Sequence, residues 1–220
     1  MDIREVVGII ESAFSSSSIG PIPKFDEYHI IKLLMILSEE KAIGRVKLSK
    51  VLSIGEGTTR TMLSRMRELG LIEESKRGCI LTKLGREVTE IVKSKIPCIA
   101  EVPIEEFGIE GKGIGVLVRE APSNIDVVKL RDEAIKRGAK ALITLVLMGE
   151  KLAMPTVEDN VKAKWPVVAN TILDTFKPSE GDAILIGIAD DHLKAEKGAL
   201  MAAWILAFKW LAQKESSNPT

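Results

Sequence analysis

The residues best suited to chemistry in the first half of the chain lie at helical spacing between Thr58 and Leu69. Arg60, Ser64 and Arg67 fall three or four positions apart, so they share one face of a helix, with Thr61 beside them. Guanidinium groups donate paired hydrogen bonds of the kind that guanine O6 and N7 accept in the DNA major groove, and hydroxyl groups also bond to base edges. This face is therefore a candidate for reading base pairs, and the alternative is an ordinary solvated helix face.

The apolar pattern shows which elements position this face. Met62, Met66 and Leu69, flanked by Leu63, form a stripe on the opposite side of the same helix. The elements expected around it are, in chain order, helices over 3–14, from 26 to about 38 and over 45–52, strands over 70–72 and 79–81 joined by a charged turn over 73–78, and a last helix that contains Val88, Ile91 and Val92.

Positive charge is concentrated around this helix, although the whole chain has a net charge of zero. Residues 24–95 hold fifteen Lys or Arg against ten Asp or Glu, a net +5, whereas residues 1–23 carry −2 and residues 96–220 carry −3. A basic segment of this kind suits contact with phosphates. The cations that we expect to face outward near the helix are Lys47, Lys50, Arg65, Lys76 and Arg77.

Two stretches of the basic segment resemble a known family. Residues 62–72, MLSRMRELGLI, followed by the hairpin and by residues 81–86, LTKLGR, look like the winged helix-turn-helix repressors of the MarR and GntR type. The resemblance implies binding of double-stranded DNA, with Arg60, Thr61, Ser64 and Arg67 in the groove and the five cations above on phosphates. Because a net charge of +5 is modest, a single domain would bind weakly, and we expect a homodimer that reads two half-sites. Some winged helices contact proteins or RNA instead.

After Pro97 the pattern changes to short apolar runs separated by glycines and amphipathic helices. We expect an N-terminal helix and linker over 1–22, a winged helix over 23–96 and an α+β domain over 97–220. Paired strands between helices favour a two-layer sandwich, with helices on one face of a largely antiparallel sheet and a homodimer that uses the other face or the final helix. The expected strands cover 99–104, 113–119, 141–148, 151–154 and 183–188, and the expected helices cover 126–137, 166–176 and 191–213.

The C-terminal domain has a resemblance of its own. Residues 130–139, LRDEAIKRGA, and residues 196–204, EKGALMAAW, resemble a group of archaeal winged-helix proteins. The C-terminal domain of that group has the β-β-α-β-β-α plan of the GAD domain that is inserted in some aspartyl-tRNA synthetases. The resemblance implies this plan for residues 97–220 and implies no particular ligand.

Six polar residues of the C-terminal domain are candidates for holding a small-molecule effector: Arg131, Asp132, Thr144, Asp190, Asp191 and His192. The last three follow a strand at a helix start, where carboxylates and an imidazole can hold a metal or act as acid and base. An aspartate helix cap with a solvated neighbour explains the same residues more simply. Arg131 and Asp132 are neighbours that cannot share a helix face, so we expect no ion pair between them. At least one of them should find a different partner, either a ligand or another chain segment. Thr144 is polar within an apolar strand.

Other kinds of chemistry are not indicated. The glycine-rich run over 111–115 lacks the P-loop pattern and precedes a strand, so we expect a turn there. Cys79 and Cys98 lack the spacing of a zinc site, and no nucleophile–base pair is evident. The longest apolar run, 198–208, is shorter than the roughly 20 residues of a membrane span, and the N-terminus lacks the basic region of a secretory leader.

We therefore expect a cytoplasmic, dimeric transcription regulator with a possible effector site, and no catalytic residue, cofactor, metal or membrane partner. The alternative is an enzyme carried by the C-terminal domain, with the winged helix as a regulatory or protein-contact module.

Overall fold

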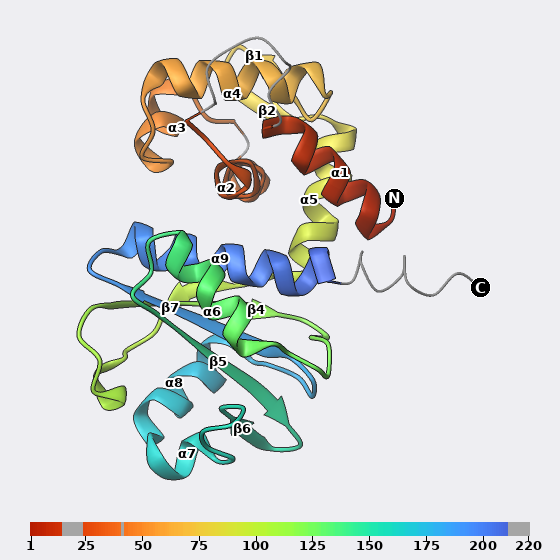
Figure 1. The fold of residues 1–220 in the computed structure, drawn as a ribbon. Coiled ribbons are helices and arrows are strands. Elements are labelled where there is room, and N and C mark those ends of the chain that lie inside the picture. The colour runs from red at the N-terminus through yellow and green to blue at the C-terminus, as the bar shows by residue number, and fades with distance from the viewer. Residues whose placement is uncertain (15–23, 41, 211–220) are drawn as a thin grey trace. The chain divides into compact units, whose positions relative to one another are not determined.

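The computed structural model describes residues 1–14, 24–40 and 42–210, and the chain divides into two compact units. The first unit comprises residues 1–93 and the second begins at Ser94 (Figure 1). The expected linker, 15–22, and the end of the expected final helix, 211–213, lie outside the described residues. None of the described helices is long and apolar enough to cross a membrane. The α+β class predicted from the sequence is confirmed.

The first unit consists of helices around one β-hairpin. Its elements are, in chain order, α1 Ile3–Phe14, α2 Glu27–Glu39, α3 Arg45–Val51, α4 Glu56–Glu68, β1 Ile72–Ser75, β2 Gly78–Leu81 and α5 Lys83–Lys95. This is the order of helices and strands that the sequence predicts. The hairpin turn is shorter than expected, because strand pairing extends to Ser75 and Gly78 and only Lys76 and Arg77 lie between the strands.

The apolar side of α4 is buried in the core of this unit. Met62 and Met66 are inaccessible to solvent and Leu63 is almost so, and α4 contacts α1, α3 and β1. Burial of three such side chains contributes roughly 1.5–3 kcal/mol each. The rotation of α4 about its axis is therefore set by its apolar stripe.

The short helix α3 differs from its expected orientation. The apolar pattern of this helix predicts that Val46, Leu48, Val51 and Leu52 all face inward. Leu48 and Leu52 are buried, but Val46 and Val51 are 50% and 44% exposed, so the prediction is wrong for both valines. A helix of seven residues makes only two turns, and one large buried side chain in each turn is enough to hold it against the core.

A close backbone contact holds the start of α5 against the hairpin. Thr82 Oγ1 donates a hydrogen bond to the carbonyl of Gly70 at 2.5 Å and accepts one from the N–H of Gly85 at 3.1 Å. A Cβ atom on Gly85 would lie 1.9 Å from the carbonyl oxygen of Leu71, far inside contact distance. The LTKLGR pattern thus has a structural reason, because its threonine caps the helix and its glycine permits the approach.

The second unit is built around a single sheet. Its elements are β3 Ile99–Glu101, η1 Glu105–Phe107, β4 Lys112–Val118, α6 Val127–Lys136, β5 Ala141–Met148, β6 Lys151–Ala153, α7 Val161–Lys164, α8 Pro166–Phe176, β7 Ala183–Ala189, α9 His192–Trp204 and the π-helical turn η2 Ile205–Lys209. A β-β-α-β-β-α order opens the unit, and β7 and α9 follow it. Most of the glycine-rich run lies in β4 rather than in a turn, since only Gly111 precedes the strand.

The five strands pair entirely antiparallel in the order β3-β4-β7-β5-β6. β7 comes last along the chain yet lies in the centre, and all seven of its residues are buried. Its sequence, AILIGIA, has no charged or hydroxyl side chain, as expected for a strand covered on both faces. The sheet is therefore complete only when residues 183–189 pair with both β4 and β5.

Helices cover both faces of this sheet (Figure 1). On one face α9 passes so close to β7 that a Cβ on Gly187 would lie 2.3 Å from the carbonyl oxygen of Ala195, and α6 packs beside α9. On the other face, Ile172 and Phe176 of α8 share a core with Ile186 of β7. The sequence predicts helices on one face only, with a homodimer that uses the other face or the final helix. Instead, α7 and α8 occupy that second face, and the sheet is the middle of three layers.

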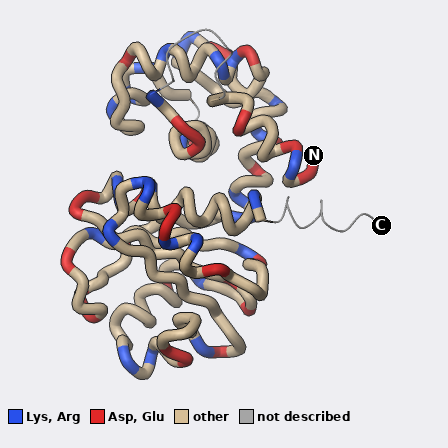
Figure 2. The backbone as a smooth tube through the Cα atoms, in the orientation of Figure 1, with Lys and Arg blue, Asp and Glu red and all other residues tan. Residues whose placement is uncertain are grey.

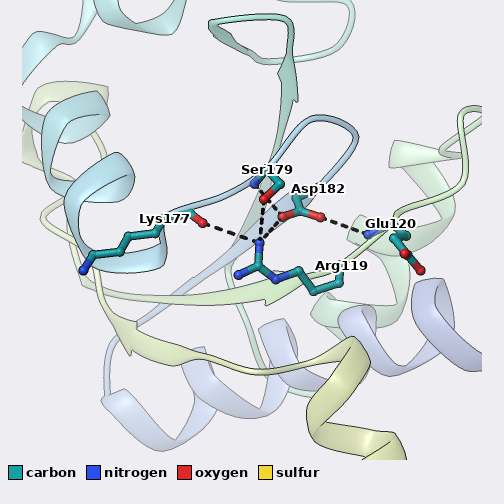
Figure 3. A network of polar contacts seen from close by, with 5 residues as sticks. All are labelled: Arg119, Glu120, Lys177, Ser179 and Asp182. Carbon is teal, nitrogen blue, oxygen red and sulfur yellow. Dashed lines mark hydrogen bonds and ion pairs between the residues drawn. The ribbon is translucent and has the colours of Figure 1, made fainter.

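A buried carboxylate joins the end of β4 to the turn before β7. Asp182 is 2% exposed, and its carboxylate accepts hydrogen bonds from Arg119 Nη1, from the N–H of Ser179 at 2.7 Å and from the N–H of Glu120 at 3.0 Å (Figure 3). Arg119 Nη1 also lies 3.4 Å from the carbonyl of Lys177 (Figure 3). Since one buried carboxylate satisfies several donors, this network stabilises the fold and is not a ligand-binding site.

Replacing Gly85 with alanine is expected to destabilise the first unit, because the added methyl group must displace the backbone at Leu71. We expect the free energy of unfolding to fall by about 3 kcal/mol in urea denaturation of the full chain. Gly8→Ala is the matched control, because Gly8 also lies in a helix but its added Cβ would meet open space, so stability should rise by up to about 1 kcal/mol. Equal effects of the two variants would contradict the close contact.

Asp182→Asn should lower the free energy of unfolding by about 3 kcal/mol, because the amide leaves the Arg119 charge uncompensated and turns one acceptor into a donor. The control is Asp190→Asn, which breaks an ion pair to Lys140 in which both side chains are more than half exposed. That loss should stay below about 1 kcal/mol. Chemical denaturation followed by tryptophan fluorescence measures both, and similar losses would show that the Asp182 network adds nothing.

Candidate nucleic-acid interface

The exposed face of α4 carries the polar residues whose spacing suggests base contacts. Arg60, Thr61 and Arg67 are exposed and Ser64 is half-buried. Gly55 is the N-cap, with extended backbone, so α4 begins directly after a tight turn from α3. Because the opposite side of α4 is held in the core, these four side chains lie on the side of the helix that solvent or a partner can reach.

Most of these side chains already bond within the unit. Arg67 Nη1 donates to Glu74 Oε1 at 2.5 Å, which links α4 to the hairpin. Ser64 and Thr61 donate to groups of α4 itself. The Arg60 guanidinium makes no hydrogen bond or ion pair within the described part of the chain, so Arg60 is the cation that this face presents.

Among the cations of α3 and the hairpin, some have an ion-pair partner within the unit and others have none among the described residues. Lys76 and Arg77 form the hairpin tip, and their exposed side chains have no partner among the described residues. Lys50 on α3 is likewise exposed and without a described partner. Lys47 differs, because its Nζ lies 2.6 Å from Glu40 Oε1.

Arg65 has a different environment from the other expected phosphate contacts. Its Nη1 lies 3.3 Å from the carbonyl oxygen of Phe14, at the end of α1, and its guanidinium stacks 5.5 Å from the ring centre of Phe25. The hydrogen bond to the carbonyl and the contact with the aromatic ring together hold the guanidinium in place. The structure thus gives Arg65 a role in joining α4 to α1.

One arginine near this face was not predicted. Arg45 begins α3 and, together with Arg60 and Arg67, lines a recess of about 330 Å³ beside the hairpin. It is brought there by the antiparallel bridge between Ile43 and Cys79, which no local sequence pattern reveals. Burial raises the pKa of the Cys79 thiol, and the Glu74 carboxylate adds to this shift while Arg67 opposes it, so the thiol is uncharged at neutral pH.

Net charge alone does not mark this interface. Lys, Arg, Asp and Glu are interspersed along the backbone in both units (Figure 2). Within the candidate interface, the cations that lack a partner among the described residues are Lys50, Arg60, Lys76 and Arg77.

The effector candidates on α6 pair with each other. Arg131 Nη2 lies 3.1 Å from Asp132 Oδ1, so the expectation that adjacent residues would not form an ion pair is wrong. Both side chains are about half exposed, and the long arginine side chain can bend along the helix surface to reach its neighbour. Thr144 lies elsewhere, buried within β5.

The three candidates at the start of α9 form separate surface contacts. Asp191 caps the helix by accepting a hydrogen bond from the N–H of Lys194 at 2.9 Å, and this bond lowers the pKa of its carboxyl. His192 Nε2 lies 2.9 Å from Glu101 Oε1, and Asp190 pairs with Lys140. Among the described residues, no three His, Cys, Asp or Glu side chains gather in a way that could hold a metal ion. The helix-cap explanation therefore accounts for Asp191.

Two domain families match separate parts of the chain. Residues 29–87 match the model of the PH0730-like N-terminal domain, and residues 109–206 match a domain of unknown function, DUF4443. A comparison with curated proteins finds no match. Among solved structures, the hypothetical protein PH0730 from Pyrococcus horikoshii OT3 is similar, with 29% sequence identity and a TM-score of 0.69. The likeness covers 89% of this chain and 97% of that one, so the chain is similar to an archaeal protein over most of its length.

Proposed function

We propose that this protein is a transcription regulator that binds double-stranded DNA through a winged helix-turn-helix over residues 23–96, with α4 as the recognition helix. The observation that carries the proposal is Arg60, an exposed guanidinium on the outer face of α4 that has no partner among the described residues. A free arginine in this position can donate two hydrogen bonds to one guanine in the major groove.

The order of α3, α4 and the hairpin supports this assignment. In a helix-turn-helix, the second helix lies in the major groove while the first crosses the DNA backbone. α3 and α4 follow one another with only residues 52–55 between them. The hairpin would then be the wing, with Lys76 and Arg77 at its tip available for phosphates.

The existing ion pairs determine how much free energy each cation loses when it contacts a phosphate. Lys50, Lys76 and Arg77 can meet phosphates without losing a partner. Lys47 and Arg67 would first leave Glu40 and Glu74, but exposed ion pairs of this kind contribute only about 0–1 kcal/mol. Phosphate contacts of one unit are therefore few. Because log K falls with log salt by about 0.9 for each contact, three such contacts should give a weak affinity and a slope of roughly −3.

We further propose a homodimer, because one unit with few phosphate contacts binds weakly, and two copies that read two half-sites increase the affinity. The second unit would join the two copies and respond to a small molecule. The free thiols of Cys79 and Cys98 suit a cytoplasmic location.

Arg60→Ala should remove sequence preference, whereas Arg77→Ala should weaken binding to all duplexes alike. Loss of a bidentate base contact corresponds to about 1–3 kcal/mol of discrimination, and loss of a phosphate contact reduces the slope of log K against log salt by about one. The measurement is fluorescence anisotropy with duplexes that the wild-type protein enriches from genomic fragments, over a salt series. Arg131→Ala, which removes the same charge from α6, is the control and should leave both quantities unchanged.

Two results would contradict the proposal. One is the absence of binding to any duplex at low salt, which would leave the first unit as a protein-contact module. The other is a loss in Arg131→Ala as large as that in Arg60→Ala, because α6 carries none of the proposed contacts.

A further inference from the structure

A recess opens between α3, α4 and the hairpin in the first unit. Its volume is about 330 Å³, and its lining includes Arg45, Arg60 and Arg67 from the two helices and Glu74 and Cys79 from the hairpin. This volume lies at the lower end of the range of small-molecule sites, roughly 300–1,000 Å³.

The charge of the recess favours an anion. Three guanidinium groups line it, against the single carboxylate of Glu74. Arg67 is already paired with that carboxylate at 2.5 Å, whereas Arg45 approaches Glu56 only to 4.0 Å and Arg60 has no partner among the described residues. The lining residues thus carry a net charge of +2, of which only the Arg45 charge has a further carboxylate, Glu56, at the limit of ion-pair distance.

Two buried residues of the lining add no negative charge. Leu63 and Cys79 also line the recess and are 4% and 5% exposed. Because burial raises the pKa of the Cys79 thiol, that sulfur stays neutral. Buried side chains such as these lower the local dielectric constant, which strengthens the attraction between the arginines and a bound anion.

We infer that this recess binds a small phosphorylated ligand, a phosphomonoester or diphosphate, whose oxygens accept hydrogen bonds from Arg45, Arg60 and Arg67. Arginine is suited to this role because its planar fork of donors matches phosphate geometry. Arg60 and Arg67 also belong to the face proposed to contact DNA, so the bound ligand and the duplex compete. That competition rests on the proposed function, whereas the anion site does not.

The first experiment measures binding of pyrophosphate to the full-length protein by isothermal titration calorimetry at constant ionic strength. Arg45→Gln is the test variant, because Arg45 lines the recess but is not among the proposed DNA contacts. Lys50→Gln is the matched control, because it removes one exposed charge from the same helix outside the recess. We expect Arg45→Gln to weaken binding at least about ten-fold and Lys50→Gln to change it less than about two-fold. Arg60→Gln serves as a second recess variant if Arg45→Gln lowers the melting temperature.

The second experiment adds pyrophosphate to the protein bound to a labelled duplex. We expect displacement in the wild type, and the same displacement in Arg45→Gln only at about ten-fold higher pyrophosphate. If duplex binding is absent but pyrophosphate binding depends on Arg45, the anion site stands and the DNA function fails.

Two outcomes overturn the anion site itself. Equal weakening by Arg45→Gln and Lys50→Gln would mean that pyrophosphate responds only to overall charge. If pyrophosphate does not bind but Arg45→Gln weakens duplex binding, the recess holds a phosphate of the DNA backbone and no free ligand.

Discussion

Burial of Met62, Leu63 and Met66 is the constraint on which the candidate interface depends. A helix with three large side chains in the core cannot rotate about its axis without exposing them, at a cost of roughly 1.5–3 kcal/mol for each. Arg60 and Arg67 are held on the outer face by this packing and not by any bond of their own to the core. A rigid helix that presents arginines is the arrangement that recognition of a base edge or a phosphate requires.

Close backbone contacts, made possible by glycine, bring the elements of each unit together. At Gly85 the start of α5 meets the carbonyl of Leu71, which positions the hairpin relative to the helices. At Gly187 the centre of the sheet meets α9 in the same manner. Sterics explain why glycine occupies both positions, because any side chain would overlap a backbone atom of the neighbouring element.

Surface ion pairs decide which cations remain available for a partner. Arg67 and Lys47 have carboxylates beside them, whereas Arg60 and the hairpin tip have none among the described residues. This division suits an interface in which Arg60 makes a specific contact and the other cations contact the phosphate backbone. In the recess beside Arg60, a small anion and a DNA duplex would therefore contact the same side chains.

Helical and strand periodicities are local properties of the chain, and they predict the elements of the first unit, those of the second unit except η1 and α7, and the exposed face of α4. The strand at 141–148 and the helix at 166–176 have the predicted limits for this reason. Three arrangements emerge only in the folded chain: β7 lies in the centre of the sheet, α8 covers its second face, and Arg45 joins Arg60 beside the hairpin. These arrangements depend on pairing between residues far apart in the chain, such as Ile43 with Cys79. Local sequence patterns do not predict such pairings, because they reflect only the environment of each separate element.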